Sequence, residues 1–255
     1  MNNSMVRVAT LAVAMMGSCL SMQAGSLAIL CSEGGDPTCS GAVSAMQATG
    51  RFSSVTGIDT TGSTPTLADL AGFNAILAET DFAPSDPAAL GNVLASYYAL
   101  GGKELTVATY AFSAPWEIDG TVMTGGYSAL TNVGTNGSVS GNLVATVPGD
   151  PIFDGVDLST VTYFNNPNFA HPGLAPGAIL LATDGSGVNM IARSPLGVID
   201  VNLYPGDTGD NNAEFFGLLA NTLTSTPEPS ALTLMGAGLA ALLISRSRRR
   251  NSATR

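Results

Sequence analysis

The sequence predicts an α/β fold with a doubly wound, mostly parallel sheet sandwiched by helices, plus an antiparallel β excursion. Three observations lead to this prediction. Strand and helix patterns alternate within residues 26–112, which is the order typical of a parallel sheet. Residues 134–147 are rich in Gly and Asn, which indicates a hairpin or a long excursion. Two later strand patterns flank the turn "DGSG" at 184–187, which favours an antiparallel hairpin.

The first half of the body supplies the parallel part of the predicted sheet. Short apolar or alternating runs predict its strands, and helix patterns lie between them. The clearest helix can be capped by Ser85 or Asp86, has Pro87 in its first turn and ends at a Gly pair. The predicted strands are 26–30, 52–59, 73–79 and 104–112, and the predicted helices are 40–50, 64–72 and 85–102.

The second half supplies the remaining strands and a closing helix. Strand patterns occupy residues 177–183, 188–193 and 196–205. A helix pattern follows at 210–224, with Asp210 or Asn211 as its expected cap and a repeating set of Phe and Leu as its buried face. Residues 25–224 therefore form one predicted domain, which is long enough to bury a substantial core.

The amino terminus reads as a secretory signal peptide that spans residues 1–24. Arg7 is its one charged residue, and an apolar stretch follows before small and polar residues lead to Ala24. Cleavage is expected after Ala24. The third residue before this cut is usually small, and here it is the larger Met22, so the exact site of cleavage stays open. Cys19 leaves a lipoprotein signal as an alternative.

The carboxyl terminus predicts a linker at 225–229 and a transmembrane helix with a basic tail at 230–255. The 16 uncharged residues from Ser230 to Ser245 would form a helix about 24 Å long, which is short for a bilayer core of about 30 Å. A core helix is the alternative. The arginines that follow are expected to stop transfer and stay cytoplasmic; they are Arg246, Arg248, Arg249 and Arg250.

The order of Pro-Glu-Pro, apolar helix and arginine cluster resembles the PEP-CTERM sorting signal. The resemblance implies a Gram-negative bacterium that makes exopolysaccharide, export through the inner membrane, and removal of the helix by exosortase. It implies exosortase and the secretion machinery as partners, transient contact with the inner membrane, and a mature protein in the periplasm, at the cell surface or outside the cell. Exopolysaccharide is a further expected partner, and a permanent membrane anchor is the alternative. The sorting residues would be Pro227, Glu228 and Pro229.

The segment between the two terminal signals is strongly acidic. It contains 18 of the 19 Asp and Glu residues but only three of the nine Lys and Arg residues, namely Arg51, Lys103 and Arg193. Such a body repels nucleic acid and anionic membrane, which excludes nucleic acid as a partner.

Cysteine usage agrees with export. Of the three cysteines, Cys31 and Cys39 follow the signal, and an oxidising compartment favours a disulfide between them, with two free thiols as the alternative. His171 is the one histidine, and no second cysteine pair is present, so no zinc site is expected. No cofactor is expected either. Ca²⁺ is an alternative ligand for the oxygen-rich loop that holds Asp207, Asp210, Asn211 and Asn212.

The body resembles the class I glutamine amidotransferase-like fold, a flavodoxin-like sandwich. The resemblance rests on the segments "LAILC", "FNAILAE", "LASYYALGGKELTVATYAF", "DPIFDGV" and "ILLATDGSGVNMIARSPLGVIDVNLYP". It implies a cysteine nucleophile at a Gly-x-Cys-x-Gly elbow with a histidine and an acid, but the corresponding strand here runs into "ATYAFSAPW". Ser113 and His171 are the remaining candidates for a nucleophile and base, oriented by Glu117, Asp119 or Asp200.

These patterns predict a non-catalytic exported protein of the cell surface or extracellular matrix. A glycan- or cation-binding module is one alternative, because Trp116 and its aromatic neighbours Tyr110 and Phe112 lie near the sheet edge where doubly wound folds bind ligands. An amidotransferase-fold hydrolase with an atypical site is the other. The candidate ligand-binding residues are Trp116, Ser113 and His171.

Overall fold

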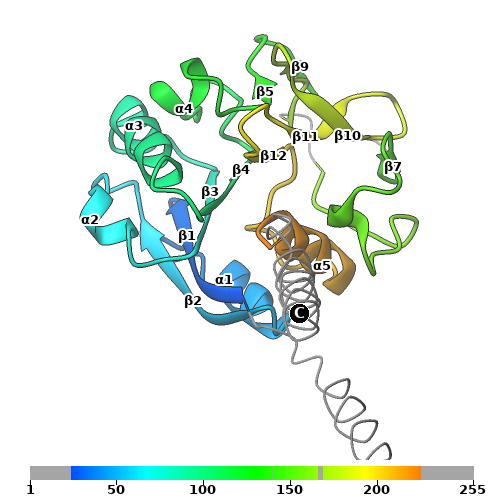
Figure 1. Ribbon diagram of the computed structural model, residues 1–255. Helices are drawn as coiled ribbons and strands as arrows, with labels where there is room; N and C mark the ends of the chain where they lie inside the picture. Colours follow the sequence, from blue (N-terminus) through cyan, green and yellow to red (C-terminus); the bar gives the residue numbers. More distant parts are fainter. Residues whose placement is uncertain (1–23, 140, 166–168, 225–255) are drawn as a thin grey trace, which may run out of the picture.

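A computed structural model describes residues 24–139, 141–165 and 169–224 of the protein. They build an α/β sandwich around an eight-stranded sheet (Figure 1). In order across the sheet, the strands are β2 (Phe52–Asp59), β1 (Ala24–Ser32), β3 (Ala75–Thr80), β4 (Glu104–Ala108), β12 (Ile199–Val201), β11 (Asn189–Arg193), β10 (Ile179–Thr183) and β7 (Val144–Ala145).

The strand directions confirm the predicted mostly parallel sheet with an antiparallel part. The pairs β1–β2, β1–β3, β3–β4 and β4–β12 are all parallel. Beyond β12 the sheet continues in antiparallel register through β11, β10 and β7. The β10–β11 hairpin closes at the predicted turn, where Asp184 accepts backbone hydrogen bonds from Ser186 and Val188.

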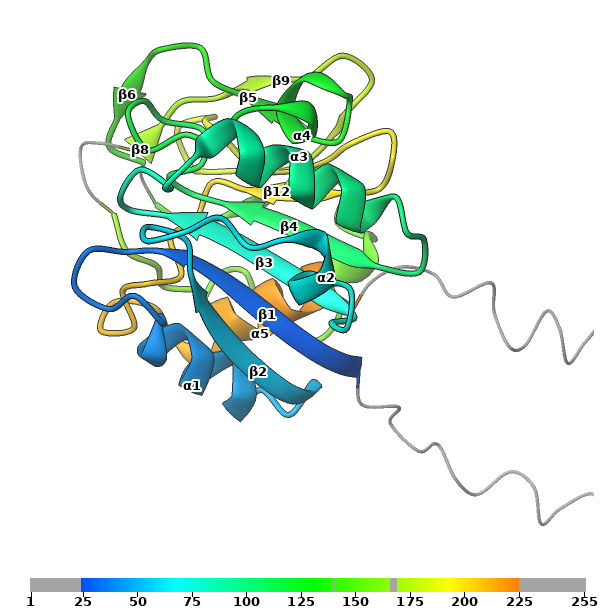
Figure 2. The ribbon, with the colours of Figure 1, turned by 90° about the vertical axis from the view of Figure 1, so that its left-hand side faces the viewer.

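Alternation along each parallel strand divides the core into two layers. In β1, Leu27 and Ile29 pack on one face, and Ala28 and Leu30 pack on the other. The first face is covered by α1 (Ser40–Ala48) and α5 (Ala213–Thr222), and the second by α2 (Leu67–Leu70), α3 (Pro87–Tyr98) and α4 (Thr121–Thr124), as Figure 2 shows. The near-continuous apolar sequence of β3, buried at every position, follows from this coverage.

Local chemistry explains where the helices begin. Asp86 caps α3 by accepting from the backbone N–H of Ala89, and Thr66 forms a reciprocal capping box with Asp69 at the start of α2. At α5 the predicted cap is wrong by one or two positions. Asn212, rather than Asp210 or Asn211, accepts from the backbone N–H of Phe215, so the helix begins later than 210.

The Gly- and Asn-rich middle forms an excursion rather than one hairpin. β6 (Asn136–Gly137) pairs with β8 (Phe169–Ala170), and β5 (Leu130–Thr131) pairs with β9 (Gly173–Leu174). β7 instead joins the edge of the main sheet against β10. The segment predicted as a strand to residue 112 is also shorter, because β4 ends at Ala108 and the chain turns there.

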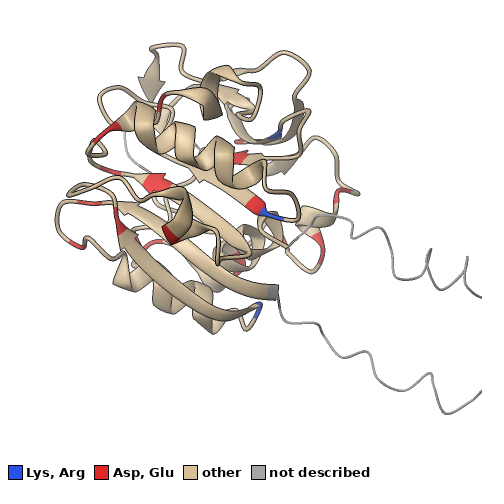
Figure 3. Ribbon diagram, turned by 60° about the vertical axis from the view of Figure 1, so that its left-hand side comes forward, with Lys and Arg blue, Asp and Glu red and all other residues tan. Residues whose placement is uncertain are grey.

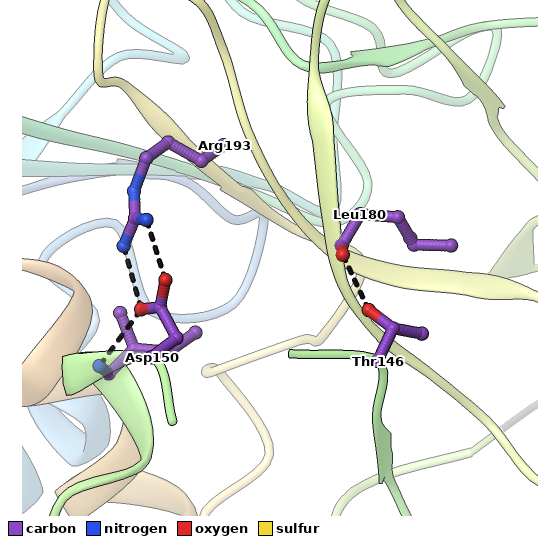
Figure 4. A network of polar contacts seen from close by, with 5 residues as sticks. Thr146, Asp150, Leu180 and Arg193 are labelled. Carbon is purple, nitrogen blue, oxygen red and sulfur yellow. Dashed lines mark hydrogen bonds and ion pairs between the residues drawn. The ribbon is translucent and has the colours of Figure 1, made fainter. Parts of the chain in front are cut away.

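A short 3-10 helix, η1 (Pro151–Phe153), fastens the excursion to the antiparallel strands. Arg193 on β11 donates two hydrogen bonds to the carboxylate of Asp150, at 2.6 and 2.8 Å (Figure 4). Asp150 also accepts from the backbone N–H of Ile152, and Thr146 donates to the carbonyl of Leu180. These contacts fix residues 146–150 to β10 and β11, so the excursion is held on the sheet although its own strand, β7, has two residues.

The first and last described residues lie on the same side of the sheet, at the amino edge, where the parallel strands begin; the opposite, carboxyl edge is where these strands end. β1 begins at the amino edge, and α5 runs back toward it after the chain leaves β12 (Figure 2). Among the described residues, none of the helices has the length and hydropathy needed to cross a bilayer. Residues 1–23 of the predicted signal peptide lie outside the described residues, and its last residue, Ala24, is the first of β1. The predicted linker and transmembrane helix also lie outside the described residues, as do the sorting residues and the arginine cluster.

Candidate ligand site at the carboxyl edge of the sheet

The chain changes winding direction between β1 and β3. From β1 it passes outward to β2 and then crosses back to β3, so the carboxyl ends of β1 and β3 form the topological switch point. In doubly wound folds this is the usual place for a ligand. Here the backbone N–H groups of Asp81 and Phe82, which follow β3, donate to the carbonyl of Ser32 at the end of β1. The backbone therefore draws the two strand ends together.

A buried carboxyl pair lies at this switch point. Glu79 on β3 is 1% exposed, and Glu33 follows β1 and accepts a 2.8 Å hydrogen bond from the hydroxyl of Tyr204. Burial raises the pKa of Glu79 well above its usual range, and the charge of Glu33 adds to this effect. Burial likewise raises the pKa of Glu33, against the opposing hydrogen bond from Tyr204. Among the described residues, the buried Oε2 of Glu79 has no hydrogen-bond partner.

A disulfide lies directly beside this pair. Cys31 and Cys39 are bonded, with their Cα atoms 5.9 Å apart, and Sγ of Cys39 is 2.6 Å from Oε1 of Glu79. Within the described part of the chain, these three residues are the one group of His, Cys, Asp and Glu side chains with metal-ligand spacing. A disulfide offers no thiolate, which is the form of cysteine that binds metals.

An aromatic cluster fills the space beyond β4. Tyr110 is 2% exposed, and its ring centroid lies 5.4 Å from those of Trp116 and Phe169 and 5.5 Å from that of Tyr204. Phe164 extends the cluster through contacts with Phe169 and Tyr204. The half-buried ring of Trp116 thus rests on a fully packed base, at the strand exit where the amidotransferase resemblance would place a nucleophile.

Ser113 and His171 both lie against β6 but are not hydrogen-bonded to each other. Ser113 is fully buried and donates to the side-chain oxygen of Asn136 at 3.4 Å. The ring of His171 lies against Gly137, where an added Cβ would be 2.9 Å from Cε1, and its enclosed Nε2 has no hydrogen-bond partner. The described residues therefore contain no assembled serine–histidine pair.

The three candidate orienting acids also lie elsewhere. Asp200 on β12 is fully buried, and one of its oxygens accepts from the hydroxyl of Ser128 and from the backbone N–H groups of Ala129 and Leu130. Burial raises the pKa of Asp200 to about 7 despite these hydrogen bonds. Glu117 and Asp119 line a separate pocket beyond β4.

The oxygen-rich loop before α5 uses several of its side chains within the fold. Asp207 accepts from the backbone N–H groups of Gly209 and Asp210, which closes a turn. Asn211 accepts from the backbone of Phe164 and donates to the carbonyl of Tyr204. The Ca²⁺ alternative for this loop stays a prediction.

Charge is distributed unevenly across the sheet. Arg51 and Lys103 immediately precede β2 and β4, at the amino edge. Acidic residues instead gather in the loops that follow the parallel strands, at the carboxyl edge (Figure 3). After β1, β3 and β4 they are Glu33, Asp36, Asp81, Asp86, Glu117 and Asp119, and after β12 they are Asp207 and Asp210. Glu104 lies beside Lys103 at the amino edge.

The tail of the chain matches a known sorting signal. Residues 225–250 match the PEP-CTERM protein-sorting motif. PEP-CTERM proteins are exported across the inner membrane and processed at the carboxyl terminus by a system in which exosortase recognises the motif. The chain is therefore exported, and it ends in the periplasm or on the cell surface. No curated protein sequence matches the chain significantly.

One solved structure shares the fold of the body. A ThuA-like protein from Bacteroides uniformis superposes with a TM-score of 0.51 at 12% identity, covering 78% of this chain and 89% of that one. The protein SMU.1228c gives a TM-score of 0.46 at 15% identity, covering 78% of this chain and 98% of that one. The glutamine amidotransferase-like α/β fold predicted from the sequence is confirmed.

Two features of the site escaped the sequence analysis. The sequence could have indicated the Glu33–Glu79 pair, because Glu79 is an acid within the largely apolar strand "AILAET". The pocket beyond β4 had no such signal, because four short stretches between residues 111 and 132 form it and no pattern in the sequence brings them together.

Proposed function

We propose that this chain is a non-catalytic protein of the cell surface or extracellular matrix, delivered there by its PEP-CTERM motif. The observation that carries the proposal is the packing of Tyr110 at the exit of β4. A nucleophile at this position would need open space and a base within hydrogen-bond reach. Three aromatic rings surround Tyr110 instead, and the nearby hydroxyl of Ser113 donates to an amide oxygen rather than to His171.

The test is a search for activity that depends on the candidate nucleophile. The exported protein, purified with its disulfide intact, would be treated with a fluorophosphonate probe and assayed for glutaminase and esterase turnover. Ser113→Ala and His171→Ala variants serve as controls. We expect no labelling or turnover above that of the variants. Turnover that disappears in both variants would overturn the proposal in favour of a hydrolase.

Glycan binding is a second candidate, and Trp116 is the observation that favours it. Its half-buried ring is held on Tyr110, with centroids 5.4 Å apart, so one aromatic surface is fixed in place near the sheet edge. Aromatic rings of this kind stack on sugar rings, and exopolysaccharide is the proposed partner. Binding to a glycan array that is lost in Trp116→Ala, but kept in Trp116→Phe, would support this candidate. No binding by the parent protein would exclude it for the glycans on the array.

A further inference from the structure

A pocket of about 220 Å³ opens beyond β4, on the α3 side of the sheet. Its lining combines acids with hydroxyl, amide and apolar side chains, and it contains no Lys, Arg or His. The lining residues are Ala111, Phe112, Glu117, Ile118, Asp119, Met123, Leu130, Thr131 and Asn132. The site is distinct from the aromatic cluster and from the Glu33–Glu79 pair.

Two independent anchors hold the sides of this pocket. The loop at 117–120 lies directly on α3, because Gly91 has no side chain there; an added Cβ would be 1.7 Å from the carbonyl oxygen of Asp119. The second anchor is at Leu130, another lining residue, where the buried side chain of Asp200 accepts from the backbone N–H groups of Ala129 and Leu130. The pocket is therefore part of the folded domain rather than a gap between loops.

Glu117 gives the pocket its chemical character. Its Oε2 is enclosed and has no hydrogen-bond partner among the described residues. Removing a carboxylate from water without a partner is unfavourable, so a positively charged ligand in the pocket would stabilise the charge of Glu117. Among the described residues the one ion pair is that between Arg193 and Asp150. Neither Glu117 nor the exposed Asp119 therefore has a cationic partner in this part of the chain.

The remaining lining favours an organic cation over a bare metal ion. Phe112, Met123 and Leu130 are carbon-rich, and an aromatic ring or a thioether accommodates a large, weakly hydrated cation. Ca²⁺ is bound by about six to eight oxygen ligands, whereas the two acids that line this pocket are Glu117 and Asp119. Its volume lies below the range of about 300–1,000 Å³ of pockets for drug-sized ligands, so the ligand is small.

We propose that this pocket binds a small organic ammonium ion, with Glu117 as its main charge partner and Asp119 at its mouth. The acidic residues at the carboxyl edge raise the local concentration of cations and so assist their entry. The proposal goes beyond the proposed function and does not depend on whether the domain is catalytic.

The test compares matched ligands on the exported, disulfide-bonded protein. Choline and n-butylammonium are the cationic probes, and 3,3-dimethylbutan-1-ol is the uncharged isostere of choline. Saturation-transfer NMR and calorimetry would measure their binding. We expect both cations to bind and the neutral isostere to bind at least about tenfold more weakly. Equal binding of choline and its isostere, or no binding of either cation, would overturn the proposal.

Variants assign the binding to this pocket. Glu117→Gln keeps the shape of the side chain and should weaken choline binding about tenfold, whereas Asp119→Asn should weaken it less because Asp119 is exposed. Asp154→Asn, an exposed site with the same change in charge, should have no effect. Unfolding midpoints would establish that each variant is folded. Unchanged affinity in folded Glu117→Gln would contradict the proposal, and if that variant does not fold, unchanged affinity in Asp119→Asn would do so.

Discussion

Replacing Asp200 with Asn should change how the stability of this domain depends on pH. Asp200 is fully buried on β12, and one of its oxygens accepts three hydrogen bonds, while the other has no hydrogen-bond partner in the part of the chain that the structure describes. Asn keeps one oxygen that can accept the same three hydrogen bonds. Its NH2 group takes the place of the other oxygen and does not titrate, so the effect of ionisation is read from the pH dependence of the difference between variant and parent and not from its absolute size.

The size of the effect follows from the shifted pKa. Burial raises the pKa of Asp200 from 3.8 to about 7. A carboxyl whose pKa is raised on folding stabilises the protein below its unfolded pKa, and this contribution is lost as pH rises through the folded pKa. A shift of about three pH units corresponds to about 4 kcal/mol of unfolding free energy, lost between about pH 4 and pH 7.

The measurement is equilibrium unfolding in urea, followed through the fluorescence of Trp116, at intervals from pH 4.5 to pH 8. The difference in unfolding free energy between Asp200→Asn and the parent should rise in favour of the variant by about 3 kcal/mol over this range, because part of the loss already occurs below pH 4.5. Other shifted groups, including Glu79 and Glu33, are the same in both chains and cancel in the difference. Asp154→Asn at an exposed site should instead follow the parent curve.

The reasoning would be refuted if the Asp200→Asn and parent curves stayed parallel from pH 4.5 to pH 8. That result would mean that Asp200 has its ordinary pKa in the folded protein. It would also mean that the three donated hydrogen bonds offset the burial of its charge.

Three further predictions concern the disulfide, the ion pair and the tail. Replacing Cys31 and Cys39 with Ser should lower the free energy of unfolding by about 2–3 kcal/mol, because the unfolded chain is no longer restrained; equal stability in urea would contradict this. Arg193→Met should lower it by about 1–3 kcal/mol, because the carboxylate of Asp150 loses both of its charged donors; Arg193→Lys should recover part of the loss in the same assay. Glu228→Ala should leave the domain folded but trap uncleaved chain in the inner membrane of an exosortase-positive host. Release at the parental rate, measured by fractionation and immunoblotting, would identify the tail as an ordinary anchor.

The elements that carry their own periodicity and caps were predictable from the sequence. β2 occupies the predicted residues, and α3 begins after Asp86, one of its two predicted caps. The end of β4 was not predictable, because Ala111 and Phe112 continue the apolar run after strand pairing has stopped. These two residues are apolar because they pack in the core on the α3 side of the sheet, and a buried strand would have the same apolar composition. The strands β5, β6, β8 and β9 have two residues each, which is too short for a periodic pattern.

The candidate site was predictable in its position and only partly in its content. The carboxyl edge of the sheet follows from the α/β order of the elements, and Trp116 lies there as expected. The Glu33–Glu79 contact depends on the register of β1 with β3, in which Cys31 is paired with Glu79. Register across a parallel pair is set by the packing of both faces, which no local pattern in either strand records.

The shared position of the two ends of the domain has a consequence for its orientation on a membrane. β1 starts and α5 finishes at the amino edge of the sheet, and only the segment 225–229 separates the domain from the apolar part of the PEP-CTERM motif. If the apolar part of the motif inserts in the inner membrane as the sequence predicts, so short a segment would direct the amino edge, with Arg51 and Lys103, toward the lipid headgroups. The carboxyl edge, with Trp116 and the pocket lined by Glu117, would then face the periplasm, open to solutes before exosortase acts.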